Sequence, residues 1–236
     1  MRNEDTIAAI STSPGESGIG IVRISGKNAL PVLKKIFKNG RDKGLAAAGF
    51  PSHTLQYGFI VSPDTGRTQD EVLVSYMKAP KSYTREDVVE INSHGSMIAL
   101  KKITELVTNN GARLAEPGEF TKRAFLNGRL DLSQAEAVID IIQAKTEANL
   151  EAAVEQLKGR VSKEIAGICE RLKGLQALIE ADIDFPEEDI ERITRKEIKK
   201  QLLEIQRRLQ KLLESAEYGK ILKDGLRVVI AGKPNT

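Results

Sequence analysis

A long helical repeat of apolar residues in the second half of the sequence is the feature that most constrains the fold. The repeat advances in steps of three and four through Leu150, Val154, Leu157, Val161, Ile165, Ile168, Leu172, Leu175 and Ile179. Such steps place one apolar stripe along one side of an α-helix. We therefore expect a long helix that ends at Asp184-Phe185-Pro186, and a stripe of this length needs other helices to pack against.

Helix-start signals divide this region further. Ser133 and Glu136 form an S-x-x-E pattern that predicts a capping box at the start of this same long helix, with the apolar stripe in its later part. Thr194 and Glu197 predict the start of a second long helix, which we expect to end at Gly219. The apolar positions of this second helix are Ile198, Leu202, Ile205, Leu209 and Leu212. Two long amphipathic helices favour an antiparallel bundle with a purely structural role.

The sequence before Pro117 alternates short strands, helices and turns. We expect strands over 6–12, 19–26, 53–61, 71–79 and 88–92, with helices over 28–37 and 96–107. The stretch SPDTGRTQD, which is rich in turn residues, predicts a hairpin between the third and fourth of these strands. The chain is therefore predicted to be α+β, with an α/β domain of roughly 115 residues followed by a helical domain.

Composition narrows the class of protein. The 236 residues are 40% hydrophobic and 29% charged, as in an ordinary folded protein, and the net charge of +3 does not by itself indicate a nucleic-acid partner. The single cysteine, Cys169, cannot form an internal disulfide and suits a reducing compartment. The N-terminal residues do not resemble a secretion signal, and no apolar stretch approaches the ~20 residues of a membrane span. We expect a soluble, cytoplasmic protein with no membrane partner.

Two charged residues interrupt apolar strands and are candidate binding residues. Arg23 lies within IGIVRISG and Glu90 within VVEINSHG. A charge inside an apolar strand is costly unless it has a partner. One interpretation is an internal Arg23–Glu90 pair. The other is a ligand that presents adjacent N–H donors to Glu90, as pterin and guanine rings do.

The glycine-rich stretch SPGESGIG precedes the strand that carries Arg23. Its Gly15, Gly18 and Gly20 do not have the G-x-G-x-x-G spacing, and a strand rather than a helix follows them. A turn between two strands is the structural interpretation. A loop that lets a ligand approach the backbone is the functional one.

The last residues, GLRVVIAGKPNT, are typical of the start of a phosphate-binding loop. An apolar strand meets Gly232, but the second glycine, the lysine and the hydroxyl residue of G-x-x-x-x-G-K-[ST] do not follow. Either this likeness to a phosphate-binding loop is accidental, or the chain is the front part of something larger. Half a loop is not expected to retain a nucleotide.

Five stretches together resemble one family, the tRNA-modification GTPases called MnmE or TrmE. They are DTIAAISTSPGESGIGIVRISG, SYTREDVVEINSHG, PGEFTKRAFLNGRLDLSQAEAVIDIIQA, ADIDFPEEDI and LRVVIAGKPNT. They follow the family's order and cover most of the chain, and the third is the most specific. The part between about Lys27 and Lys81 is variable.

The resemblance implies three domains. These are a tetrahydrofolate-binding and dimerising domain over 1–118, the first part of a helical domain over 119–219, and the start of a Ras-like GTPase domain over 220–236. Members work with an FAD-containing partner, MnmG, to add a carboxymethylaminomethyl-type group at C5 of the wobble uridine of certain tRNAs. The one-carbon unit comes from 5-formyl- or 5,10-methylene-tetrahydrofolate. GTP hydrolysis, with potassium and magnesium, drives the rearrangement.

The resemblance also assigns residues. Arg23, Glu90 and Arg129 correspond to folate-contacting positions, and the family often has lysine where this chain has Arg129. Asn235 matches an asparagine that contacts GTP and potassium, and Thr236 follows it in the nucleotide loop. No catalytic residue of the GTPase is expected in this chain, which we expect to bind folate and dimerise but not to hydrolyse GTP.

Two other functions are compatible with the sequence. The chain is a dimerisation scaffold that docks the FAD-containing partner, or it is an independent one-carbon transferase similar to the aminomethyltransferases. The long helices and the start of a phosphate-binding loop argue against the second of these. Folate affinity separates the scaffold from the folate-binding protein.

Overall fold

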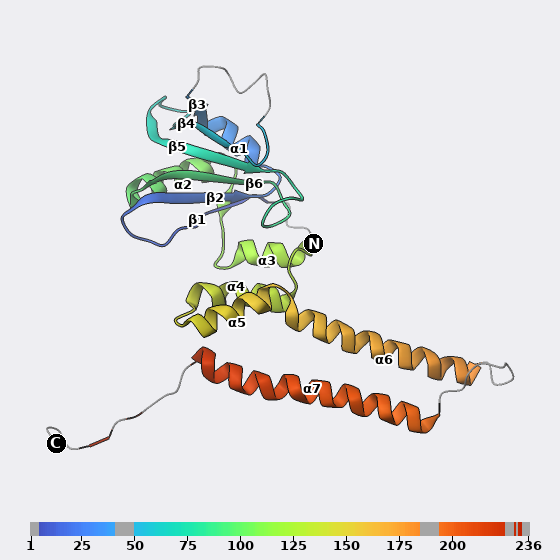
Figure 1. The fold of residues 1–236 in the computed structure, drawn as a ribbon. Helices are drawn as coiled ribbons and strands as arrows, with labels where there is room; N and C mark the ends of the chain where they lie inside the picture. The colour runs from blue at the N-terminus through green and yellow to red at the C-terminus, as the bar shows by residue number, and fades with distance from the viewer. Residues whose placement is uncertain (1–4, 41–49, 185–193, 225–228, 230, 233–236) are drawn as a thin grey trace. The chain divides into compact units, whose positions relative to one another are not determined.

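The computed structural model describes the chain except for residues 1–4, 41–49, 185–193, 225–228, 230 and 233–236. It divides into two compact units, Met1–Leu130 and Asp131–Thr236. The first is a mixed α/β unit and the second is helical (Figure 1). Within the described residues, no helix is both long and apolar enough to cross a membrane.

A seven-stranded sheet organises the first unit. Its strand order is β3-β4-β5-β6-β2-β1-β7, and every neighbouring pair is antiparallel except β1 and β7. The strands are β1 Ile7–Ile10, β2 Ser17–Ser25, β3 Phe37–Asn39, β4 Leu55–Val61, β5 Thr68–Met77, β6 Val88–Gly95 and β7 Arg113–Leu114. The predicted hairpin is confirmed, because β4 pairs with β5 along its whole length.

Two helices, α1 (Ala29–Ile36) and α2 (Met97–Asn109), pack on one face of this sheet and enclose the core. Successive side chains of a β-strand point to opposite faces of the sheet, so every second side chain reaches that core. The fully buried strand residues include Val22, Ile24, Val74, Val89 and Ile91, which meet Leu33, Leu100 and Ile103 of the helices. The intervening residues of β2 and β6, among them Arg23 and Glu90, therefore lie on the opposite face.

Residues 13–16 of the glycine-rich stretch lie in the connection between the antiparallel strands β1 and β2, as the structural interpretation predicted, and the rest of the stretch belongs to β2. Gly15 has a φ of 139°, a backbone conformation that other residues rarely adopt. Gly20 serves helix packing instead. A Cβ added there would lie 2.6 Å from Leu100 Cδ1, so the absence of a side chain lets α2 approach the sheet.

The short helix α3 (Glu119–Leu126) belongs to the first unit, because the division between units lies after Leu130 rather than after 118. Side chains of α3 explain this position. Arg123 of α3 donates to Asp5 at the start of β1, and Glu119 accepts from Arg113 of β7. These contacts join α3 to the edge of the sheet.

The second unit contains α4 (Leu132–Gln143), α5 (Glu147–Leu157), α6 (Arg160–Asp184) and α7 (Arg195–Asp224). The predicted capping box of Ser133 with Glu136 is wrong. Asp131 instead caps α4: its side chain accepts from the Gln134 backbone N–H at 2.9 Å, and Gln134 Oε1 accepts from the Asp131 N–H at 3.0 Å. Asp131 and Gln134 thus make the two reciprocal hydrogen bonds of a capping box two residues before the predicted pair.

The predicted long helix from Ser133 to Asp184 is wrong, because the structure has three helices there. The helical backbone is interrupted between α4 and α5 at residues 144–146, and between α5 and α6 at Lys158 and Gly159. Gly159 has a φ of 79°, which ends a helix at little cost for glycine. The apolar steps continue across the break, so periodicity alone did not reveal it. The end of α6 at Asp184 agrees with the prediction, although Phe185 and Pro186 lie outside the described residues.

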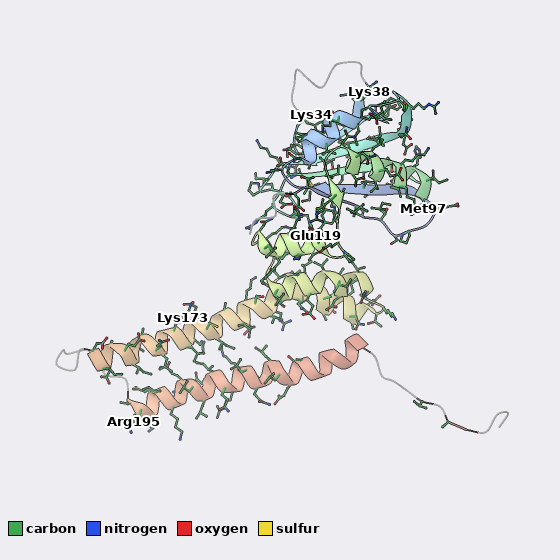
Figure 2. The ribbon with its side chains drawn as sticks, turned by 180° about the vertical axis from the view of Figure 1, so that it is seen from behind. Lys34, Lys38, Met97, Glu119, Lys173 and Arg195 are labelled. Carbon is green, nitrogen blue, oxygen red and sulfur yellow. The ribbon has the colours of Figure 1, made fainter. Side chains whose placement is uncertain are left out.

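Helix α7 begins as predicted. Thr194 and Glu197 form the expected reciprocal cap, with the Thr194 N–H donating to Glu197 Oε2 at 2.9 Å and the Glu197 N–H donating to Thr194 Oγ1 at 3.3 Å. The predicted end at Gly219 is wrong, since α7 continues to Asp224. Glycine in a helix interior weakens the helix without stopping it. Figures 1 and 2 show α6 and α7 running antiparallel, as a bundle requires.

The predicted first strand of a GTPase domain does not appear in the described residues. Val229, Ala231 and Gly232 have no regular secondary structure, and Val229 is 87% exposed. The remaining residues between 225 and 236 lie outside the described part of the chain.

Candidate functional site

Arg23 and Glu90 face each other across the β2–β6 pair, on the sheet face that α1 and α2 do not cover. Arg23 Nε and Nη2 each lie 2.8 Å from Glu90 Oε1. The side chains are 27% and 23% exposed, so both are reachable from solvent. The internal pair that the sequence left open is therefore present, and Arg23 contacts only one of the two carboxylate oxygens.

Two aromatic rings border this pair. The guanidinium carbon of Arg23 lies 5.6 Å from the ring centroid of Tyr83 and 5.6 Å from that of Phe120. Tyr83 comes from the connection between β5 and β6, and Phe120 from α3. Both distances are within the range of cation–π attraction, so the rings hold the charged side chain of Arg23 in place.

Arg129 completes the cluster from a third part of the chain. Its guanidinium carbon lies 4.7 Å from the Tyr83 ring centroid, and its Nη1 donates to the Tyr83 carbonyl oxygen at 3.2 Å. Arg23, Glu90 and Arg129, which the sequence singled out, thus gather around Tyr83. Their role as ligand-binding residues stays a prediction.

Sequence reasoning missed Tyr83 and Phe120, the two rings of the site. Both lie inside stretches that carry the family resemblance, SYTREDVVEINSHG and PGEFTKRAFLNGRL. The signal that was available is the rarity of aromatic residues, which make up 4% of the chain. Placing them beside Arg23 requires knowledge of how the β5–β6 connection and α3 fold over the sheet.

A buried ion network fixes α3, and with it Phe120. Arg123 is 2% exposed and lies between the carboxylates of Asp5, Glu86 and Glu119, at 2.8, 3.3 and 3.0 Å. Figure 2 labels Glu119, which is 3% exposed. Hydrogen bonds from the Arg113 guanidinium lower the pKa of Glu119 to about 2, although burial opposes this shift.

The connection that carries Tyr83 is bound to the end of α3. Arg85 Nη1 donates to the Asn127 carbonyl oxygen at 3.0 Å, and Asn127 Nδ2 donates to the Thr84 carbonyl oxygen at 2.7 Å. The hydroxyls of Tyr83 and Thr121 lie 2.9 Å apart. Because these contacts link both segments at several points, Tyr83 and Phe120 are held in one arrangement.

The cluster combines three chemical features. Two guanidinium groups can bind an anion such as a carboxylate. The rings offer flat surfaces against which a heterocycle can stack. Glu90 offers an acceptor for paired N–H donors. The predicted nucleotide and potassium residues, Asn235 and Thr236, lie outside the described residues.

Comparison with known proteins agrees with the fold and the motifs. Residues 6–129 match the model of the GTP-binding protein TrmE N-terminus. Residues 132–229 match the model of the MnmE helical domain. The chain belongs to the MnmE/TrmE family. The first matched region lies within the unit Met1–Leu130, and the second lies within the unit Asp131–Thr236.

Curated relatives are similar along the whole chain. It is 53% identical over 235 residues to the tRNA modification GTPase MnmE of Alkaliphilus oremlandii, with 100% of this chain and 50% of that protein aligned. It is 57% identical over 231 residues to the protein of the same name from Thermoanaerobacter pseudethanolicus, covering 98% of this chain and 50% of the relative. The chain therefore spans about half the length of the curated relatives that it matches.

Proposed function

We propose that this chain is the folate-binding and helical part of a tRNA-modification GTPase, and that the cluster of Arg23, Glu90 and Arg129 binds a reduced folate. The ligand is 5-formyl- or 5,10-methylene-tetrahydrofolate, which supplies a one-carbon unit. The observation that carries the proposal is the half-buried Glu90 carboxylate beside two aromatic rings and two arginines.

The residues present fit the chemistry of a folate. A pterin ring places an exocyclic amine beside a ring N–H, and one carboxylate can accept from both. Arg23 contacts only Oε1 of Glu90, so it does not occupy Oε2. The glutamate end of a folate is anionic, and Arg129 is an exposed cation on the rim of the cluster. Arg129 forms two parallel N–H bonds more readily than lysine would.

The complete reaction belongs to the whole protein. We propose that it adds a carboxymethylaminomethyl-type group at C5 of the wobble uridine, together with the FAD-dependent partner MnmG. GTP hydrolysis, with its potassium and magnesium, is assigned to the half of the relatives that this chain does not span. Asn235 and Thr236 are the GTP and potassium contacts that this chain contributes in that setting. In that case this chain by itself binds folate and leaves GTP unhydrolysed.

The first unit is also proposed to form a homodimer. The face that carries Glu90 continues onto β4 and β5, where Leu55, Tyr57 and Leu73 are exposed at 62%, 44% and 44%. Neighbouring exposed apolar side chains of this kind favour a protein interface. A second copy of the chain is the occupant that the family resemblance implies.

A scaffold without folate binding is the competing function. It is favoured by the internal Arg23–Glu90 pair, in which each charge already has its partner. In that case the chain dimerises and docks the FAD-containing partner, and the cluster only stabilises the sheet and α3.

Calorimetric titration with 5-formyl-tetrahydrofolate separates the two functions. We expect saturable binding that Glu90→Ala abolishes, because the mutant has no acceptor for the pterin donors. Glu71→Ala is a matched control, since Glu71 lies on the neighbouring strand β5 and on the same sheet face. A folded wild-type dimer that takes up no folate would exclude the folate site and leave the scaffold.

A further inference from the structure

Positive charge is concentrated on the first half of α7. Between Arg195 and Lys211 the chain has seven basic and two acidic residues, a surplus of five positive charges. The whole chain has a net charge of only +3, so the rest of the chain is net negative. A surplus confined to one segment indicates a site for an anionic partner more strongly than a basic composition does.

Four of these cations share one side of the helix. Lys196, Lys200, Arg207 and Lys211 follow each other at intervals of four, seven and four residues, and all are exposed. The interval from the first to the last corresponds to about 22 Å along the helix axis. We call these four residues the cationic stripe. Figure 2 labels Arg195, the first residue of α7, which immediately precedes the stripe in the sequence.

The opposite side of α7 packs within its own unit. Ile198, Ile205 and Leu212, spaced by seven, are the least exposed residues of this segment, and Ile205 is 5% exposed. The cationic stripe is rotated by about half a turn from this line, because each residue advances by about 100° around the helix. It therefore faces away from the packed side of the helix.

Acidic residues of α7 offset the stripe only in part. The pKa of Glu197 is lowered chiefly by its hydrogen bonds with Thr194 and, to a smaller extent, by the charge of Lys200. Lys196 with Lys200 and Arg207 with Lys211 are like-charged pairs one turn apart, which destabilise a helix slightly. Glu197 is engaged in the cap with Thr194. In the part of the chain that the structure describes, no ion pair reaches the four stripe residues. Elsewhere in this unit lysines are paired, as in Lys158–Glu155 and Lys173–Glu170.

The N-terminal half of the stripe borders a hollow of about 300 Å³ on the helix surface. Its lining is Lys196, Lys199, Lys200, Leu203, Glu204 and Arg207. Four cations around one recess suit an anion that sits among them, such as a phosphodiester group. Glu204 is the one acidic residue of this lining and opposes such an anion.

We propose that the cationic stripe of α7 binds the phosphate backbone of the tRNA. The identity of the RNA rests on the proposed function; the requirement for a polyanion rests on the charges of α7. A membrane surface fits less well, because a helix that lies in a lipid interface needs a free apolar side, and Ile205 in the middle of the apolar side of α7 is buried. Leu202, Leu209 and Leu213 beside it are exposed, so the test below includes lipid vesicles. The contacts are to phosphates and position the RNA without reading its sequence.

Fluorescence anisotropy of this chain with an unmodified tRNA transcript tests the proposal. The test variant is Lys196→Gln/Lys200→Gln/Arg207→Gln, since glutamine keeps the helix propensity. At low salt we expect at least tenfold weaker binding. The slope of log K against log salt should fall by about two to three, one contact per removed cation. Glu204→Gln should change affinity in the opposite direction and tighten binding two- to fivefold.

The matched control is Lys34→Gln/Lys101→Gln/Lys102→Gln, which removes the same charge from exposed positions of α1 and α2. We expect its tRNA affinity to stay within twofold of the wild type. Equal losses in the two triple variants, no tRNA binding by the wild type at low salt, or binding to phosphatidylserine vesicles but not to tRNA would each overturn the proposal. Folate titration of the stripe variant gives a separate result, because a failed folate site leaves the tRNA measurement unaffected.

Discussion

Arg129 lies over the ring of Tyr83, with its guanidinium carbon 4.7 Å from the ring centroid and its Nη1 bonded to the Tyr83 carbonyl oxygen. The same ring lies 5.6 Å from the guanidinium carbon of Arg23. Tyr83 therefore joins two arginines that are distant in the sequence, and the position of both depends on one aromatic side chain.

Replacing Tyr83 tests this dependence. Tyr83→Ala removes the surface that both guanidinium groups contact, and each cation–π contact at such a site is worth about 0.5–1 kcal/mol. We expect the folate affinity in calorimetry to fall by roughly tenfold. Tyr83→Phe keeps the ring and loses only the contact with Thr121, so its affinity should stay close to that of the wild type. Equal losses in both variants would show that the hydroxyl, not the ring, matters.

Arg123 is expected to be the most sensitive charged residue of the first unit. It is 2% exposed and contacts three carboxylates, so Arg123→Met leaves Glu119 buried without one of its partners. Breaking a buried ion pair costs about 3–5 kcal/mol of unfolding free energy. Urea unfolding measures this loss. Lys122→Met, an exposed neighbour on α3, should change stability by less than about 0.5 kcal/mol, and a comparable loss there would contradict the prediction.

The lowered pKa of Glu119 predicts how the free energy of unfolding depends on pH. Its pKa falls from 4.5 to about 2 on folding, chiefly through the hydrogen bonds from Arg113, so its stabilisation is complete above pH 4.5 and is lost as the pH falls toward 2. The difference corresponds to roughly 3 kcal/mol. In urea titrations from neutral pH to pH 2, Glu119→Gln should flatten this acid-dependent loss. Parallel pH profiles of the wild type and the variant would rule out this role for Glu119.

Two glycines of the helical unit should respond to alanine in opposite directions. Gly159, with its φ of 79°, separates α5 from α6, and alanine there is destabilising by about 1 kcal/mol. An added Cβ would also lie 3.2 Å from Gln134 Nε2. Gly174 lies inside α6 with open space around it, so Gly174→Ala should stabilise the unit by about 0.5–1 kcal/mol. Thermal unfolding measures both, and stabilisation by Gly159→Ala would show that no break is required.

The proposed dimer depends on the exposed apolar side chains of the sheet face. Leu73→Asp places a charge among Leu55 and Tyr57, and we expect sedimentation velocity to show a shift from dimer to monomer. Ile98→Asp is the control, because Ile98 is 71% exposed on α2, which covers the other face. A Leu73→Asp protein that remains dimeric would place the interface elsewhere.

The sequence determined the features that depend on neighbouring residues. The β4–β5 hairpin follows from turn residues between two apolar strands, and the start of α7 follows from Thr194 and Glu197. Where two local signals compete, the sequence misled. Ser133 and Glu136 match a cap as well as Asp131 and Gln134 do, and the apolar steps run past Gly159 without interruption. Only backbone geometry distinguishes these alternatives.

Some residues of the candidate site were likewise recognisable from the sequence, and others were placed there by the tertiary structure. Arg23 and Glu90 were recognisable because a charge inside an apolar strand needs a partner. That they face each other was decided by the pairing of β2 with β6, which joins residues 67 positions apart. Phe120 reaches the site because the buried Arg123 fixes α3 against Asp5 and Glu86. Tyr83 reaches it because the β5–β6 connection is bound to Asn127 at the end of α3. Side chains brought together by long-range pairing carry no local signal, so this part of the site was decided by the tertiary structure alone.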